Sequence, residues 1–448
     1  MKKNASSARR LAWESLIEYQ KRRRDPDEIL DAHLPPGMPE RDRGLAWEIV
    51  KGTIRHLKKL DYIAQVFIKA PLRSQKPRVL AALRMGLYQL IEMPGMAQFA
   101  AVDETVSVLS DSGLKRDAGF VNAVLRSYIR EPLKAKFPDS KTEPLKYLST
   151  FHSFPRWVVK RWFGRYGYDE TEAILSAMNK PAPTSFRVMG SKRSRDEIIA
   201  DLGNAGVKAV PGRYLADYIE TDETLKVIRS ELFANGALMA QDEAQGIPLY
   251  LLNPPPGASV LDICSAPGGK TSALADMVGP DGEVISVDKD RARLKLVEQN
   301  IRRLKLPNVK TVCEDVFEFA PARKMEYILL DVPCTGFGTL PHNVDLKWSK
   351  REKDVQALAG LQRRMLAKAV EFLSDGGRLV YSTCTTEPEE IEEAIDDFLE
   401  SHGEFHLQDS DNEYLREFRT RPGVYRTWPH RHGIGAGGFA LLRKNHGE

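Results

Sequence analysis

The chain has 448 residues, 29% of them charged and 42% hydrophobic, which is the balance of a globular protein long enough for several domains. No stretch approaches the roughly 18 apolar residues that a membrane-spanning helix needs, so a membrane protein is excluded and no membrane partner is expected. The N-terminal residues MKKNASSARRLAWESL contain no apolar signal core, and we therefore expect a cytoplasmic protein.

Charge is distributed unevenly along the chain. Residues 1–140 contain 25 Lys and Arg against 17 Asp and Glu, whereas residues 241–448 contain 26 against 33. A basic N-terminal part suits contact with a polyanion such as RNA. From charge alone, solvated helix faces in a charge-rich chain explain the same counts equally well.

Three regions follow one another along the chain. In residues 1–135 apolar residues recur at helical spacing, which predicts an all-α bundle with basic clusters at KRRR and RHLKKL. Residues 136–235 contain short helices and then strand, helix and strand in SFRVMGSKRSRDEIIADLGNAGVKAV, which predicts linker helices and a small α+β unit, the latter an RNA-binding subdomain if the chain acts on RNA. Residues 236–448 alternate short apolar strands with helices and predict a Rossmann-like, doubly wound α/β domain.

A glycine-rich turn follows the first strand of the α/β region, in VLDICSAPGGKTSALADMV. Gly268 and Gly269 let the backbone approach a ligand at the start of the next helix. The turn is neither a dinucleotide fingerprint nor a triphosphate-binding loop. Asp288 ends the second strand, where an acid usually meets ribose hydroxyls, and Asp315 follows the third strand, where it could meet an adenine.

Each of these features has an ordinary structural explanation, because glycines form turns and aspartates cap helices. Their occurrence at three consecutive strand ends favours a bound adenosine-containing ligand instead.

The four cysteines are placed singly, with no C-x-x-C pair that would indicate a zinc site or a disulfide framework. Cys334 in DVPCTGFG and Cys384 in YSTCTTEPEE each follow a predicted strand, so both should face one cleft, although a lone cysteine is often only a small buried side chain. Thr386 and Glu389 fit a capping box, which predicts a helix directly after STCT. The positive end of that helix would favour a thiolate at Cys384, which is therefore the better nucleophile candidate.

Four motifs together, DICSAPGGKT, DVPCTGFGTL, YSTCTTEPEE and RTWPHRHG, resemble the NOL1/NOP2/Sun family of S-adenosylmethionine-dependent RNA 5-methylcytosine methyltransferases. AAVDETVSVL and GFVNAVLR resemble the NusB fold, so the bundle is expected to be NusB-like. The likeness covers essentially the whole chain. Ser265 stands where the family usually has Ala, and Gln245 where Ser is common.

The resemblance implies an activity and a set of site residues. It implies that C5 of a cytosine in small-subunit (16S) ribosomal RNA is methylated with S-adenosyl-L-methionine, through a covalent adduct to C6. The motif positions assign the nucleophile to Cys384, product release to Cys334, and contact with the cytosine and the methionine end of the cofactor to Asp331. Asp288 is then expected at the ribose and Asp315 near the adenine, and the cofactor cradle comprises Cys264, Ser265, Ala266, Pro267, Gly268, Gly269 and Lys270.

Two other functions fit the sequence less well, a tRNA cytosine-C5 methyltransferase and a non-catalytic RNA-binding assembly factor. We expect a monomer that acts on free or partly assembled ribosomal RNA. RTWPHRHG, with Arg426, His430, Arg431 and His432, is interpreted as a wall of the active site. No metal is predicted, because the H-x-H pair has no third ligand near it in sequence.

Overall fold

The computed structural model describes residues 7–446, and the chain divides into two compact units. Unit 1 comprises Met1–Lys180 with Asn343–Lys350, and unit 2 comprises Pro181–His342 with Arg351–Glu448. Within the described residues no helix is long and apolar enough to cross a membrane. The predicted all-α part, small α+β part and Rossmann-like part are all present, and the domain boundaries at residues 135 and 235 stay predictions.

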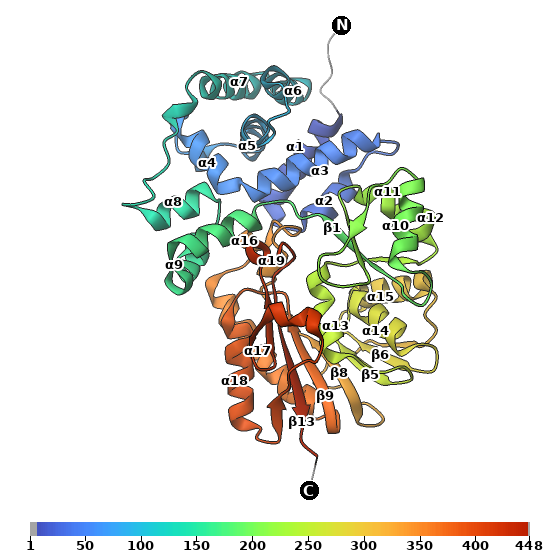
Figure 1. Ribbon diagram of the computed structural model, residues 1–448. Helices are drawn as coiled ribbons and strands as arrows, with labels where there is room; N and C mark the ends of the chain where they lie inside the picture. Colours follow the sequence, from blue (N-terminus) through green and yellow to red (C-terminus); the bar gives the residue numbers. More distant parts are fainter. Residues whose placement is uncertain (1–6, 447–448) are drawn as a thin grey trace. The chain divides into compact units, whose positions relative to one another are not determined.

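Unit 1 is entirely helical (Figure 1). Local sequence signals set several helix starts: the Asp25 carboxylate accepts a hydrogen bond from Asp27 N at 2.8 Å ahead of α2, and α5 begins at Pro77. Apolar residues from most of these helices form one core. The helices are α1 (Ser7–Arg22), α2 (Pro26–His33), α3 (Glu40–Arg55), α4 (Leu57–Val66), α5 (Pro77–Glu92), α6 (Gln98–Asp111), α7 (Lys115–Arg130), α8 (Pro144–Phe151), α9 (Arg156–Met178) and α16 (Leu346–Ser349).

A short segment from the C-terminal half of the chain completes the core of unit 1. Val344 is buried in that core, and Trp348 Nε1 donates a hydrogen bond to Ile54 O at 2.8 Å. Lys347 is 2% exposed, and burial lowers its pKa well below the usual value. Its Nζ donates to Asn179 Oδ1 at 2.9 Å and lies 4.1 Å from the ring centroid of Phe154. The segment Asn343–Lys350, which begins three residues after DVPCTGFGTL, is therefore part of unit 1.

Replacing Trp348 with Ala should destabilise unit 1. The substitution removes a half-buried indole and leaves Ile54 O without its donor, which together should lower the free energy of unfolding by about 2–3 kcal/mol. Thermal unfolding of the full chain, followed by circular dichroism, measures the change. Ser349→Ala, at an exposed neighbour, is the matched control and should leave the melting temperature unchanged. Equal melting temperatures for both variants would contradict the anchoring role of this segment.

Unit 2 begins with a small antiparallel sheet in the order β2-β3-β1-β4. Its first helix, α10, starts with a capping box in which Ser194 N donates to Glu197 Oε2 at 2.9 Å. Phe186, Ile198 and Ile219 lie in the core between the sheet and its helices. The elements are β1 (Thr184–Val188), α10 (Arg195–Asn204), β2 (Val210–Pro211), β3 (Tyr218–Thr221), α11 (Thr224–Ile228), α12 (Glu231–Ala234) and β4 (Leu238–Ala240).

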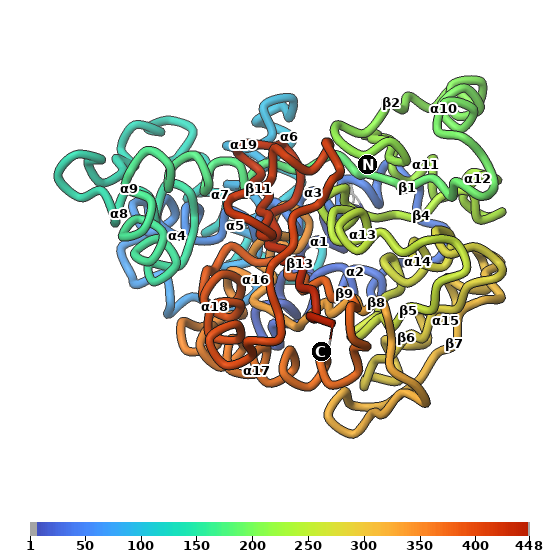
Figure 2. Tube along the Cα trace, turned by 60° about the horizontal axis from the view of Figure 1, so that its bottom comes forward, coloured from blue at the N-terminus to red at the C-terminus, as the bar shows by residue number. Residues whose placement is uncertain are grey.

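The large sheet has the order β11-β12-β13-β9-β8-β5-β6-β7, with β10 paired to β13, and Figure 2 follows it from β13 to β7. Neighbouring strands from β9 to β7 are parallel, and β13 runs antiparallel to β9. The strands are β5 (Ser259–Ile263), β6 (Glu283–Val287), β7 (Val309–Val312), β8 (Met325–Asp331), β9 (Leu373–Thr383), β10 (Phe405–Leu407), β11 (Arg419–Arg421), β12 (Val424–Thr427) and β13 (Gly437–Lys444).

Alternating side chains give this sheet two apolar faces. Val260 packs on the face covered by α13 and α14, and Leu261 packs on the face covered by α17 and α18. The helices of this part are α13 (Ile247–Leu252), α14 (Gly269–Val278), α15 (Arg291–Leu304), α17 (Glu352–Val370), α18 (Glu392–Ser401) and α19 (Pro429–His432).

Candidate active site

The predicted site residues follow strands that end at one edge of the large sheet. Cys264 follows β5, Asp288 follows β6, Asp331 ends β8 and Cys384 follows β9, and these four strands are parallel. The chain proceeds from β5 outward through β6 to β7 and then returns to the other side of β5 as β8. Such a reversal is where doubly wound sheets bind ligands, beyond the carboxyl ends of the strands.

The turn between β5 and α14 has a conformation that requires glycine. Gly268 has φ +99°, and a Cβ there would lie 3.1 Å from Val297 Cα. Gly268 N donates to Ser265 O at 2.8 Å, and Asn300 Nδ2 donates to Pro267 O at 3.0 Å. Cys264 also has a positive φ of 62°, and burial raises the pKa of its thiol to about 12, so this cysteine stays neutral.

The two acids expected at the adenosine differ in their surroundings. Asp288 is buried, and its two oxygens accept hydrogen bonds from Ala266 N at 3.2 Å and Asp290 N at 2.9 Å. Asp288 thus ties β6 to the glycine turn. Asp315, three residues beyond β7, accepts from Phe317 N at 3.2 Å, lies 3.7 Å from Lys289 Nζ and is partly exposed.

Asp331 and Lys270 form an ion pair at the end of β8. Lys270 Nζ donates to Asp331 Oδ2 at 2.8 Å, and Ser382 Oγ donates to Asp331 Oδ1 at 2.8 Å. Lys270 Nζ also donates to Gln245 Oε1 at 2.5 Å. Sequence reasoning missed Ser382, and it noted Gln245 only as a departure from a family pattern. The signal for Ser382 was its place two residues before Cys384.

Cys334 and Cys384 meet in the structure. Their Sγ atoms lie 3.2 Å apart, and both side chains are half-buried. A hydrogen bond from Cys334 and the charge of Lys270 lower the pKa of Cys384, despite opposition from burial and from Asp331. The hydrogen bond to Cys384 and burial raise the pKa of Cys334 well above the usual value. These opposite shifts favour a thiolate on Cys384, with Cys334 as its donor.

The helix predicted directly after STCT is wrong. A 3-10 turn occupies Pro388–Glu390, and α18 begins only at Glu392, with Ile391 in the position before it. Thr385, not Thr386, bonds locally: its Oγ1 accepts a hydrogen bond from Glu387 N at 3.1 Å. Ile391, with φ −133° and ψ −87°, interrupts the segment after this single turn, so no helix N-terminus adjoins Cys384. Cys334 and Lys270 supply the effect that the prediction assigned to a helix.

Residues of the RTWPHRHG segment are hydrogen-bonded to one another and to α18. Arg426 Nη1 donates to both oxygens of Glu392 at 2.9 Å, and Trp428 N donates to His432 Nδ1 at 2.9 Å. Burial lowers the pKa of His432, so its ring is neutral. The loop beyond it reaches the cysteines, because Ala436 N donates to Gly338 O at 3.0 Å and Gly338 N donates to Cys384 O at 2.9 Å. In residues 7–446 no three His, Cys, Asp or Glu gather as metal ligands would.

Sequence comparison identifies the family. Three family models match the chain: the 16S rRNA methyltransferase RsmB/F at residues 249–442, the NusB family at 6–130, and a ferredoxin-like domain of RsmF/B-like methyltransferases at 154–228. The probable ribosomal RNA small subunit methyltransferase B of Bacillus subtilis is 31% identical over 98% of this chain and 99% of its own length. The chain belongs to the 16S rRNA methyltransferase RsmB/F family.

Other RsmB/F relatives and solved structures agree with this assignment. The ribosomal RNA small subunit methyltransferase B of Vibrio cholerae is 34% identical over 83% of this chain and 84% of its own. The crystal structure of PH0851 matches 99% of this chain and all of its own, with a TM-score of 0.80 and 26% identity. A methyltransferase homologue from Pyrococcus horikoshii matches 68% of this chain and 99% of its own, with a TM-score of 0.59 and 28% identity.

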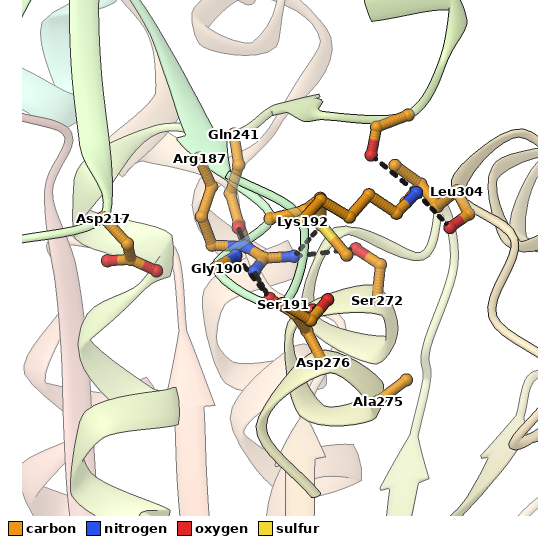
Figure 3. Close-up of polar contacts among 12 residues, drawn as sticks. Arg187, Gly190, Ser191, Lys192, Asp217, Gln241, Ser272, Ala275, Asp276 and Leu304 are labelled. Atoms are coloured by element: carbon orange, nitrogen blue, oxygen red, sulfur yellow. Dashed lines mark hydrogen bonds and ion pairs between the residues drawn. The ribbon is translucent and has the colours of Figure 1, made fainter. Parts of the chain in front are cut away.

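A buried arginine of the small sheet contacts the helix that follows the glycine turn (Figure 3). Arg187 on β1 donates from Nε to Gln241 Oε1 and from Nη2 to Ser272 Oγ, both at 3.2 Å, and its Nη1 lies 3.8 Å from Asp276 Oδ2. Ser272 Oγ in turn donates to Gly269 O at 2.9 Å. The small sheet thereby holds the first two turns of α14, which begins at the glycine turn.

Arg187→Met should strongly destabilise unit 2, because it removes the buried guanidinium that pairs with the nearly buried Asp276 carboxylate and bonds to Gln241 and Ser272. We expect a loss of about 3 kcal/mol in the free energy of unfolding, measured by urea denaturation. The double variant Arg187→Met/Asp276→Asn removes both charges and should recover most of that loss. Arg195→Met, at a surface pair on α10, is the control for losing an arginine and should change little. A single variant as stable as the wild type would contradict this prediction.

Proposed function

We propose that this protein uses S-adenosyl-L-methionine to methylate C5 of a cytosine in small-subunit (16S) ribosomal RNA, through a covalent adduct between Cys384 and C6. The observation that carries the proposal is the 3.2 Å separation of Cys334 Sγ and Cys384 Sγ beside the Asp331–Lys270 pair. The names of the relatives from Bacillus subtilis and Vibrio cholerae support ribosomal RNA as the substrate.

The residues at the glycine turn fit the proposed cofactor. A Cβ at Gly268 would be tightly packed and its positive φ strained, and Gly269 opens α14 there with backbone available at its N-terminus. Deeper in the sheet, Asp262 Oδ1 is buried without a partner, and burial raises the pKa of this carboxyl to about 7. Residues 264–270, Asp288 and Asp315 would hold the cofactor, and a solved NSun6 from Pyrococcus horikoshii with SFG shares the fold at 23% identity and a TM-score of 0.59. When bound, the cofactor supplies a methyl group from its sulfonium.

Cys384 supplies the nucleophile that cytosine needs. C5 of cytosine is a poor nucleophile, but attack of a thiolate on C6 forms an S–C6 bond and moves the C5–C6 electron pair onto C5. C5 then has enamine character and can take up the methyl group. The thiol proton of Cys384 leaves to solvent before attack, as its lowered pKa permits.

Asp331 and Lys270 provide the polar groups for this step. Attack at C6 increases electron density at N3 of the cytosine, and the positive charge of Lys270 would offset it. The Asp331 carboxylate would accept a hydrogen bond from the exocyclic amino group of the cytosine. Lys270 and Ser382 hold Asp331 in one orientation from opposite oxygens. Asp331, held in one orientation, would therefore position the base for the reaction.

Release of the product requires two bonds to break. The C5–H bond loses its proton to a base in the cleft, and its electron pair restores the C5–C6 double bond and expels Cys384 as a thiolate. Cys334, which keeps its proton because its pKa is raised, donates a hydrogen bond to the departing sulfur. Without this donor the adduct should persist.

The rest of the chain suits RNA binding. A target base must leave its stack to reach such a site, so a loop or an opened helix is the expected substrate. The NusB-family region is rich in lysine and arginine, which suits contacts to phosphates.

Methyl transfer tests the proposal directly. The full chain is incubated with S-adenosylmethionine carrying a labelled methyl group and with either undermodified 16S ribosomal RNA or undermodified tRNA. We expect label in the ribosomal RNA, recovered as 5-methylcytosine after nuclease digestion. Label in tRNA alone would replace the substrate by tRNA, and no transfer to any RNA would favour an RNA-binding assembly factor.

A further inference from the structure

One buried acid beside both cysteine loops has no part in the mechanism above. Glu390 is 0% exposed, and its Oε1 and Oε2 accept hydrogen bonds from Thr335 N at 3.2 and 3.0 Å. Thr335 Oγ1 lies 3.4 Å from Glu390 Oε2 and 2.7 Å from Thr385 Oγ1. Because Thr335 follows Cys334 and Thr385 follows Cys384, one carboxylate holds the residues next to both sulfurs.

Further bonds fix the frame around this carboxylate. Tyr381 on β9 donates its hydroxyl proton to Glu390 O at 2.8 Å. Gln362 Nε2 on α17 donates to Pro333 O at 2.9 Å, next to Cys334. The two cysteine loops are thus held by the same few residues, and a displacement of one would displace the other.

The position of Glu390 carries an energetic penalty. Among the described residues, none forms an ion pair with Glu390, and a buried carboxylate without a cation is destabilising. A neutral side chain of the same shape would remove that penalty, so the fold alone gives no reason for the charge.

We propose that Glu390 is a positioning residue of the reaction, which holds the Cys334 and Cys384 loops in register through Thr335 and Thr385. This inference rests on the proposed function. The carboxylate keeps the two sulfur atoms within hydrogen-bonding distance of each other, and this contact is what separates their roles.

The charge of Glu390 also acts on the thiols. Burial raises the pKa of Glu390 to about 7, and its negative charge raises the pKa of both Cys334 and Cys384. Glu387 in the same loop contributes to the raised pKa of Glu390, and the charge of Glu390 in turn raises the pKa of Tyr381 on β9. On the packed helices, Arg363 of α17 pairs with Asp397, and Glu392 of α18 pairs with Arg426.

Glu390→Gln separates the charge from the shape. With methylation assayed at saturating RNA, we expect kcat to fall at least tenfold while KM for RNA and for S-adenosylmethionine changes less than twofold. The rate of Cys384 alkylation by iodoacetamide, followed by peptide mass spectrometry against pH, should show a midpoint lower by about half a pH unit, because a negative charge has been removed. Glu393→Gln, at an exposed position of α18, is the matched control for both measurements.

The melting temperature of Glu390→Gln shows that the variant folds, and its pH dependence reports the loss of the Glu390 carboxyl. The folded pKa of Glu390 is raised, so its favourable contribution is complete below pH 4.5 and is lost as pH rises through about 7. The melting temperature of Glu390→Gln should therefore fall less between pH 5 and pH 8 than that of the wild type.

A second pair of variants keeps the test decisive if Glu390→Gln folds poorly. Thr385→Val removes the hydroxyl that bridges to Thr335 and should lower kcat about fivefold, and Thr385→Ser restores the hydroxyl and should recover activity to within twofold. Wild-type kcat and an unchanged alkylation midpoint in Glu390→Gln or Thr385→Val would overturn the inference. Absence of methylation by the wild type would instead overturn the proposed function, and the alkylation measurement, which needs no RNA, would still decide on Glu390.

Discussion

Cys384→Ala should abolish methylation of RNA. The substitution removes the only atom that can attack C6 in the proposed mechanism, so we expect kcat to fall by at least about a thousandfold, as for loss of other covalent nucleophiles. The side chain is small and half-buried, so the variant should fold. Initial rates of methyl transfer with saturating 16S ribosomal RNA measure the change.

Two controls define this result. Cys313→Ala changes the exposed cysteine and should keep the wild-type rate. Affinity for RNA, measured by filter binding, should be within twofold of the wild type for Cys384→Ala. Methylation at a normal rate by this variant would rule out Cys384 as the nucleophile.

Cys334→Ala should allow the covalent protein–RNA adduct to form but prevent its release. The variant keeps Cys384 and can form the S–C6 bond, but it lacks the thiol that donates to the departing sulfur at 3.2 Å. A protein–RNA complex that survives denaturant should then accumulate to roughly stoichiometric amounts with the enzyme, whereas the wild type shows little. Denaturing gel electrophoresis with labelled RNA measures it.

The double variant Cys334→Ala/Cys384→Ala is the control for this adduct and should form none. A Cys334→Ala variant that turns over normally, without any retained RNA, would remove the release role of Cys334. The loss of Cys334 also removes the hydrogen bond that lowers the pKa of Cys384. The onset of adduct formation should therefore shift to higher pH in this variant.

Much of the fold follows from the sequence because periodicity reports burial directly. Strands such as SVLDICS and YILLDVPC are short apolar runs that end in polar turns, and their parallel register brings their ends together. The glycine turn was identifiable for a different reason. Gly268 occupies a backbone conformation that disfavours other residues, so a glycine there indicates a turn.

The residues that orient the site were not predictable in the same way. Gln245 and Ser382 contact Lys270 and Asp331 from segments far apart in the chain, and only the folded structure brings them together. The segment Asn343–Lys350, which completes unit 1 from a distant part of the chain, gave no signal in the local pattern.

The helix predicted directly after STCT was wrong because local spacing did not decide the structure there. The Thr386–Glu389 spacing matches a capping box, but the segment forms a single 3-10 turn that ends at Ile391, and Thr385 and Glu390 bond to Thr335 instead. A local motif was overruled by tertiary hydrogen bonds between two loops. The thiol of Cys334, fifty residues earlier in the chain, could be recognised as a hydrogen-bond partner of Cys384 only from the sulfur–sulfur distance.

The residue to which the trapped RNA is attached identifies the nucleophile. The adduct formed by Cys334→Ala is digested with nuclease and protease, and tandem mass spectrometry locates the modified peptide. We predict a methylated cytidine nucleotide attached to Cys384 in the peptide that contains YSTCTTEPEE. Attachment to any other residue, or an adduct that is unchanged when Cys384 is replaced by Ala, would contradict the account.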